Sequence, residues 1–155
     1  METKSLHTYL QDHIAGAESA LIVIRHLNGQ AEEPALLHLL QELLEEVTED
    51  KVALERLAGS LGTQPNVLKN SAAWIGAQVV DVKARAGKTS FGAFEGLEFI
   101  SLGIQGKLHL WKALQRSASC VTAGYRPDLS LLIQRGEAQH ERVEVLRLAL
   151  ASVVL

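Results

Sequence analysis

The chain has 155 residues, of which 47% are hydrophobic, 21% charged and only 5% aromatic, and its formal net charge is −3. This length corresponds to about one domain, so we expect a single domain over residues 1–155. A protein without a basic excess has little with which to neutralise a phosphate backbone, which argues against nucleic acid as a partner.

Cysteine content and hydropathy indicate the cellular compartment in which the protein is expected. The only cysteine, Cys120, excludes an internal disulfide framework and favours a reducing environment. The first residues lack the apolar core that a signal peptide needs. No stretch approaches the roughly 18 apolar residues of a membrane span. We therefore expect a cytoplasmic protein that does not contact a membrane.

Apolar residues that recur every three or four positions predict about five helices along the chain. Their expected ranges are 5–28, 33–60, 66–86, 92–120 and 128–154. Pro34 suits the first turn of the second helix, and Asn66 is a plausible N-cap for the shorter third helix. No alternating pattern typical of a strand competes with these helices.

Four of the predicted helices have similar lengths, about 24 to 28 residues or roughly 36 to 42 Å. If the first two form an antiparallel hairpin, the third can return the chain beside them. The fourth then runs parallel to the second, and the fifth returns. The sequence therefore predicts an all-α, up-and-down bundle with a long crossover that is itself helical.

Several polar residues fall on faces of the predicted helices that should be buried. Glu46 and Asp50 are four residues apart, so they share one face of the second helix. Buried charges are costly unless they are paired. Our first interpretation is an ion-pair network in which these carboxylates meet Lys107 or Arg135. The alternative is a ligand-binding site formed by the same residues together with Gln105.

Two glycines lie three residues apart within the fourth predicted helix. Gly103 and Gly106 each cost roughly 1 kcal/mol relative to Ala, so something should offset them. One explanation is close helix packing, with Gly136 of the fifth helix opposite. The other explanation is room for a ligand beside Gln105 and Lys107.

A Glu-x-x-His pair occurs in the fifth predicted helix, where Glu137 precedes His140 by three residues. Side chains at this spacing lie on the same side of a helix. Both can therefore point toward one metal ion.

The helix lengths, the crossover and this Glu-x-x-His pair resemble the ferritin-like superfamily, and the resemblance spans most of the chain. It implies a bundle that holds two iron or two manganese ions between carboxylate and histidine ligands. The second helix has Glu46 and Glu49 at the place of the other Glu-x-x-His pair, so one histidine is missing. The candidate metal ligands are Glu18, Glu46, Glu49, Glu98, Glu137 and His140.

Three functions follow from these patterns. Because one histidine is missing, we first expect a non-catalytic ferritin-like bundle in which a polar network replaces the metal centre. Such a protein acts through protein contacts or by binding a small molecule. The second possibility is a di-metal carboxylate protein that uses iron or manganese for redox or oxygen chemistry, so an enzymatic role stays open. The third is a helical module that recruits a partner.

The end of the last predicted helix bears on the oligomeric state. Residues 146–155 carry apolar side chains on several faces of that helix. A helix that is apolar on several faces is normally covered by other protein. Since most soluble oligomers are symmetric homo-oligomers, we expect a homodimer.

Overall fold

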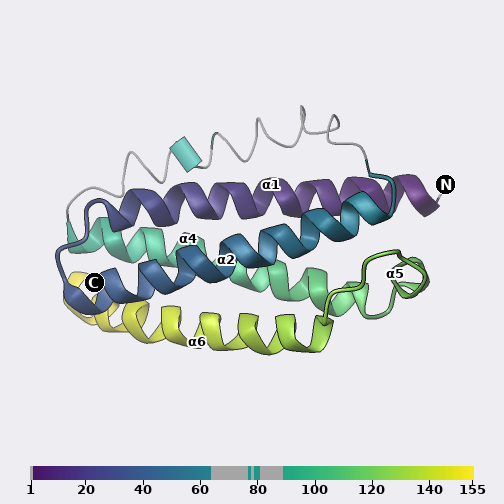
Figure 1. The fold of residues 1–155 in the computed structure, drawn as a ribbon. Coiled ribbons are helices and arrows are strands. Elements are labelled where there is room, and N and C mark those ends of the chain that lie inside the picture. Colours follow the sequence, from purple (N-terminus) through teal and green to yellow (C-terminus); the bar gives the residue numbers. More distant parts are fainter. Residues whose placement is uncertain (1, 64–76, 78, 81–88) are drawn as a thin grey trace.

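The computed structural model describes residues 2–63, 77, 79–80 and 89–155, and their regular secondary structure is helical (Figure 1). The helices are α1 (Glu2–Asn28), α2 (Pro34–Ser60), α4 (Ser90–Leu114), α5 (Ala118–Val121) and α6 (Leu129–Val154). The predicted all-α class is therefore confirmed for these residues. The helix predicted over residues 66–86 lies outside them, apart from residues 77, 79 and 80.

Side-chain caps explain where three of the long helices begin, and at α4 the Thr89 hydroxyl accepts from the Gly92 N–H at 3.1 Å. Glu33 accepts a hydrogen bond from the Leu36 N–H at 2.7 Å, and Pro34 occupies the first turn of α2, as predicted. Asp128 caps α6 in the same way, by accepting from the Leu131 N–H at 3.0 Å. These caps satisfy backbone donors that have no partner within the helix.

The prediction of one helix over residues 92–120 is wrong in its extent. α4 begins at Ser90 and ends at Leu114, and the short α5 follows after a turn. In that turn the Ser117 N–H donates to the Leu114 carbonyl, which is a tighter pattern than the α-helix. The turn returns Cys120 to the apolar cluster that contains Leu114. Apolar residues therefore continue at helical spacing although the helix does not.

The four long helices form a bundle (Figure 1). α1 and α2 are antiparallel, α2 and α4 run in the same direction, and α6 returns antiparallel to α4. α1 packs against α2 and α4, α4 packs against α6, and α2 makes a sparser contact with α6. α2 thus ends at the opposite end of the bundle from the start of α4, as the predicted crossover requires.

No helix in the described part of the chain combines the length and the apolar character needed to cross a bilayer.

The core consists of two clusters of buried apolar side chains. The first core cluster includes Leu21, Ile24, Leu40, Leu43, Ile100 and Val143. The second core cluster includes Leu10, Leu54, Leu57, Leu110, Trp111 and Leu132. On α2 the first cluster extends from Leu36 to Val47 and the second from Leu54 to Ala58, so the clusters lie toward opposite ends of the bundle. The level between them holds the candidate site.

Candidate functional site

Asp50 is the centre of a buried ion-pair network between α2, α4 and α6. Its side chain is only 2% exposed. One carboxylate oxygen accepts a hydrogen bond from Lys107 Nζ at 2.5 Å, and the other accepts from the Arg135 guanidinium. Lys107 also donates to Oε1 of Gln139, which is fully buried. The structure therefore brings together three residues that the sequence singled out: Asp50, Lys107 and Arg135.

Further ion pairs join α2 to α6 along the bundle. Arg135 also donates to Glu49 at 2.7 Å, and Arg142 donates to Glu46 at 2.6 Å and to Glu42 at 2.8 Å. We call this set the polar ladder, and its members are Glu42, Glu46, Glu49, Asp50, Arg135 and Arg142. Long side chains bridge the two helices, and their backbones approach each other at fewer points than those of the other adjacent pairs.

Burial perturbs the lysine at the centre of the network. Loss of solvent lowers the pKa of Lys107, and the adjacent Asp50 carboxylate opposes that change by favouring the charged amine. For Arg135, burial also acts to lower the pKa, but the carboxylates of Asp50 and Glu49 outweigh it and raise the pKa. The charge on Lys107 thus depends on Asp50, and the two residues form one energetic unit.

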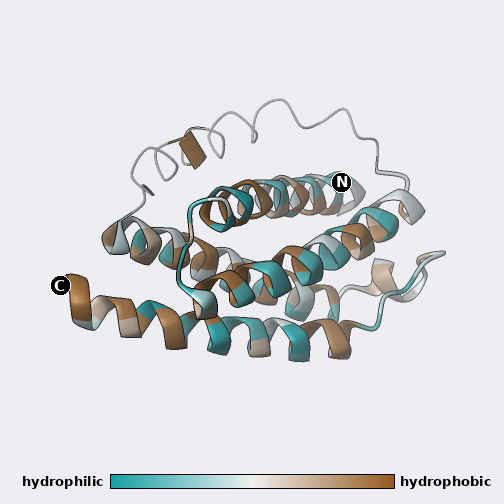
Figure 2. Ribbon diagram, turned by 60° about the vertical axis from the view of Figure 1, so that its left-hand side comes forward, coloured by the Kyte–Doolittle hydropathy of each residue, from teal (hydrophilic) through white to brown (hydrophobic). Residues whose placement is uncertain are grey.

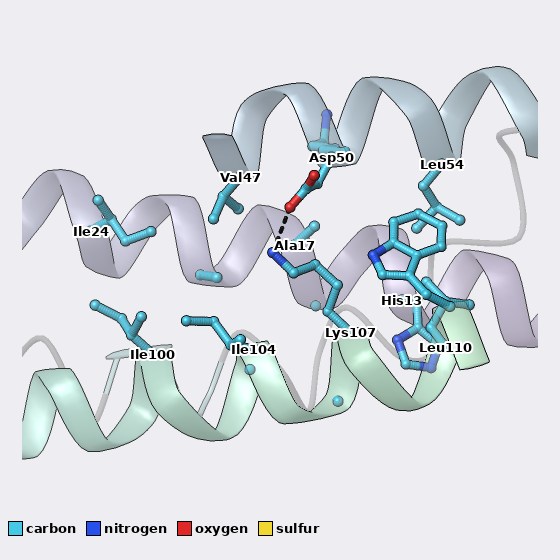
Figure 3. Close-up of a pocket in the computed structure, with 16 residues that line it drawn as sticks. His13, Ala17, Ile24, Val47, Asp50, Leu54, Ile100, Ile104, Lys107 and Leu110 are labelled. Carbon is cyan, nitrogen blue, oxygen red and sulfur yellow. Dashed lines mark hydrogen bonds and ion pairs between the residues drawn. The ribbon is translucent and has the colours of Figure 1, made fainter. Parts of the chain in front are cut away.

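A cavity of about 180 Å³ lies between α1, α2 and α4, at the boundary of the two core clusters (Figure 3). Its wall is mostly apolar and includes Ala17, Ile24, Val47, Leu54, Ile104 and Leu110. Lys107 reaches from α4 toward Asp50 on α2, and this ion pair forms the main polar part of the wall. The cavity is therefore an apolar space beside a buried pair of charges.

Three glycines border this space. A Cβ atom added at Gly16 or Gly106 would meet nothing within 4 Å, and one at Gly103 would meet only the Cβ of Ala20 at 4.0 Å. All three glycines line the cavity. A Cβ atom at Gly136 would instead lie 2.8 Å from Cδ2 of Leu108. Close packing therefore explains the glycine of α6, whereas those of α4 border open space.

Three further polar side chains line the cavity: His13, Lys51 and Trp111. Trp111 is 1% exposed, and its Nε1–H has no hydrogen-bond partner among the described residues. His13 of α1 contacts the Tyr9 ring edge-to-face, with ring centroids 4.7 Å apart. Burial lowers the pKa of His13, so its ring tends to be neutral at neutral pH. Gln105 lies on a different face of α4 and makes no hydrogen bond to Asp50 or Lys107.

The candidate metal ligands are dispersed, and each pairs with another residue. Glu18 contacts Lys51 at 2.9 Å, Glu98 contacts Arg147 at 3.2 Å, and Glu137 contacts Lys112 at 3.1 Å. Glu46 and Glu49 belong to the polar ladder, and His140 lies 3.2 Å from the Ser101 hydroxyl. No group of three or more His, Cys, Asp or Glu side chains in the described ranges is arranged to hold a metal ion.

The Glu-x-x-His pair is out of phase with the interior of the bundle. Gly136, Gln139 and Val143 are the buried residues of this part of α6, whereas Glu137 is exposed and His140 is half-buried. The sequence suggested His140 as a metal ligand facing the bundle interior and did not point to Gln139, which is central to the network. The spacing of Gly136, Gln139 and Val143 was the signal that could have found it.

A second polar cluster between α4 and α6 was also missed. The Ser101 hydroxyl donates to Glu144 at 2.8 Å, and Arg147 donates to both carboxylate oxygens of Glu144 at 2.8 Å. The Arg147 hydrogen bonds, assisted by that from Ser101, lower the pKa of Glu144 to about 2. This carboxylate is therefore held in its charged form.

Comparison with protein-family models, with curated proteins and with solved structures finds no significant match to this chain.

Proposed function

We propose that this protein is a cytoplasmic, non-catalytic helical bundle that binds a small, largely apolar molecule in the cavity between α1, α2 and α4. The observation that carries the proposal is the glycine geometry. A glycine inside a helix costs about 1 kcal/mol relative to Ala, yet at Gly16 and Gly106 no neighbour requires the absence of a side chain. Retaining that space has a physical reason if a ligand fills it.

The size of the cavity indicates the size of the ligand. Its volume of about 180 Å³ is somewhat larger than that of an engineered apolar cavity, roughly 150 Å³, that takes up benzene. A molecule with one aromatic ring and a short substituent, or an aliphatic molecule of similar volume, therefore suits it. The charged residues in the wall are engaged in ion pairs, which supports binding rather than acid–base catalysis.

Titration with ethylbenzene tests the proposal, with calorimetry and the shift in melting temperature as readouts. Binding to the folded state alone raises the melting temperature as ligand concentration rises. The Gly106→Leu variant should keep its helical circular dichroism and lose ethylbenzene binding, because the leucine fills the cavity. Gly59→Leu is the matched control, since Gly59 lies in α2 away from the cavity and also has open space around it. Equal binding by wild type and Gly106→Leu would contradict the proposal.

We further propose that the bundle is ferritin-like, with the polar ladder at the place of a metal centre. The parallel arrangement of α2 and α4 supports this reading of the topology. The ion pairs support the replacement, since a metal ion at Glu46 or Glu49 would have to displace Arg142 or Arg135. Elemental analysis after incubation with Fe(II) and Mn(II) should find no stoichiometric metal. Bound metal that is lost in Glu46→Ala would favour the di-metal alternative instead.

A homodimer remains part of the proposal. Val145, Leu148, Val153 and Leu155 of α6 are between 56% and 86% exposed, and Figure 2 shows the C-terminal end of α6 as largely hydrophobic. A second copy of the chain could cover this surface by self-complementary contact.

A further inference from the structure

The polar part of the cavity wall has more hydrogen-bond donors than acceptors. The Lys107 ammonium has three N–H groups, of which one donates to Asp50 and one to Gln139. The third has no acceptor in the described part of the chain. The Trp111 Nε1–H is buried without an acceptor as well. Buried polar groups are normally hydrogen-bonded, so two unmatched donors at one cavity call for an explanation.

The carboxylate acceptors around the cavity are already occupied. One oxygen of Asp50 accepts from Lys107 and from Gln139 Nε2 at 3.4 Å, and the other accepts from Arg135. A neutral His13 ring offers one donor and one acceptor, so it leaves the balance between donors and acceptors unchanged. An acceptor for the unmatched N–H groups must therefore come from outside the described residues.

The charges near the cavity are balanced by their partners. Lys107 pairs with Asp50, and Lys51, which also lines the cavity, contacts Glu18 at 2.9 Å and Glu55 at 2.8 Å. No lysine in the wall lacks a carboxylate partner. A neutral acceptor therefore fits better than an anion, because an anion would also have to lose its water.

Building on the proposed cavity, we propose that the ligand is a neutral carbonyl compound with an apolar, one-ring-sized body. Its carbonyl oxygen accepts hydrogen bonds from the Trp111 indole and the Lys107 ammonium, and its apolar part packs against Ile24, Val47 and Ile104. The two donors would then select a carbonyl compound over a hydrocarbon of the same shape.

A matched pair of probes tests this selection. Acetophenone and ethylbenzene have nearly the same shape and differ by a carbonyl group in place of a methylene. Burying an unmatched carbonyl is costly, so a cavity without free donors would favour ethylbenzene. We expect wild type to bind acetophenone at least as tightly as ethylbenzene. The ratio of the two affinities should shift about tenfold toward ethylbenzene in Trp111→Phe, which removes one donor. Since both probes are measured on each variant, changes in cavity volume largely cancel in the ratio.

A second variant removes the other donor. The double substitution Asp50→Leu with Lys107→Met removes both charges of the pair together without adding a donor, and it should shift the ratio in the same direction. A ratio unchanged in both variants, or a wild type that strongly prefers ethylbenzene, would overturn the carbonyl inference while leaving apolar ligand binding intact. Failure of wild type to bind either probe would overturn the proposed function and this inference together.

Discussion

At the residue scale, we expect the buried Asp50–Lys107 ion pair to have a large effect on the free energy of unfolding. Removing one member of a buried ion pair leaves the other charge without compensation, which typically costs about 3–5 kcal/mol. Lys107→Met should therefore reduce the free energy of unfolding by about 3 kcal/mol or more, and addition of Asp50→Asn should recover part of the loss. Urea denaturation of the two single variants and the double variant measures this coupling.

The exposed Lys112–Glu137 pair is the matched control for that experiment. Its side chains are 54% and 57% exposed, and exposed pairs contribute about 0–1 kcal/mol. Lys112→Met should therefore change the free energy of unfolding little. A comparable loss in Lys107→Met and Lys112→Met would show that Lys107 is not energetically buried.

The lowered pKa of Glu144 predicts that its contribution to stability depends on pH. Its pKa falls from 4.5 to about 2 on folding, so the folded state favours its ionised form. Its contribution to stability is present above about pH 4.5 and is lost as the pH falls toward 2. Glu144→Gln should therefore be less stable than wild type at pH 7, and the difference should shrink near pH 2. Urea denaturation at both pH values measures it, with the exposed Glu141→Gln on the same helix as control. A difference that does not depend on pH would contradict the ionic origin.

At the scale of the element, replacing glycines inside helices by alanine should change the free energy of unfolding in opposite directions at two sites. A Cβ atom at Gly106 meets open space, so Gly106→Ala should raise the free energy of unfolding by about 0.5–1 kcal/mol through helix propensity. A Cβ atom at Gly136 would lie 2.8 Å from the buried Leu108, and overpacking costs about 1–3 kcal/mol. Gly136→Ala should therefore be destabilising. Thermal and urea denaturation of the two variants measure these changes in the free energy of unfolding. Changes of the same sign would show that the two sites do not differ in packing.

The same element scale shows how a helical motif can mislead. Glu137 and His140 have the spacing of a metal-binding pair, but α6 is rotated so that Gln139 faces the interior. A shift of one residue turns a helix by about 100°. The rotation of α6 is set by Gly136 against Leu108 and by Val143 in the first core cluster, and neither contact can be read from the motif itself.

At the scale of the whole molecule, the exposed end of α6 predicts self-association. If a second copy covers Leu148, which is 56% exposed, sedimentation equilibrium should give the mass of a dimer. Leu148→Glu should then shift the protein to monomer, because burying an unpaired carboxylate at an interface is unfavourable. Glu141→Gln, a change on the same helix that introduces no charge, is the control. A wild-type monomer at concentrations well above those used for ligand titration would exclude the proposed dimer.

Sequence alone determined the helical class, the extents of α1 and α2 to within a few residues, and the need of Asp50 for a cation. Those features depend on local rules: apolar spacing, caps and the cost of burying charge. Tertiary structure decided that both Lys107 and Arg135 meet Asp50 and that Gln139 joins them. It also decided that Gly103 and Gly106 border a cavity whereas Gly136 is packed. It also paired the candidate metal ligands with other side chains. These outcomes depend on the relative rotation and separation of helices that are far apart in the sequence, which no local pattern specifies.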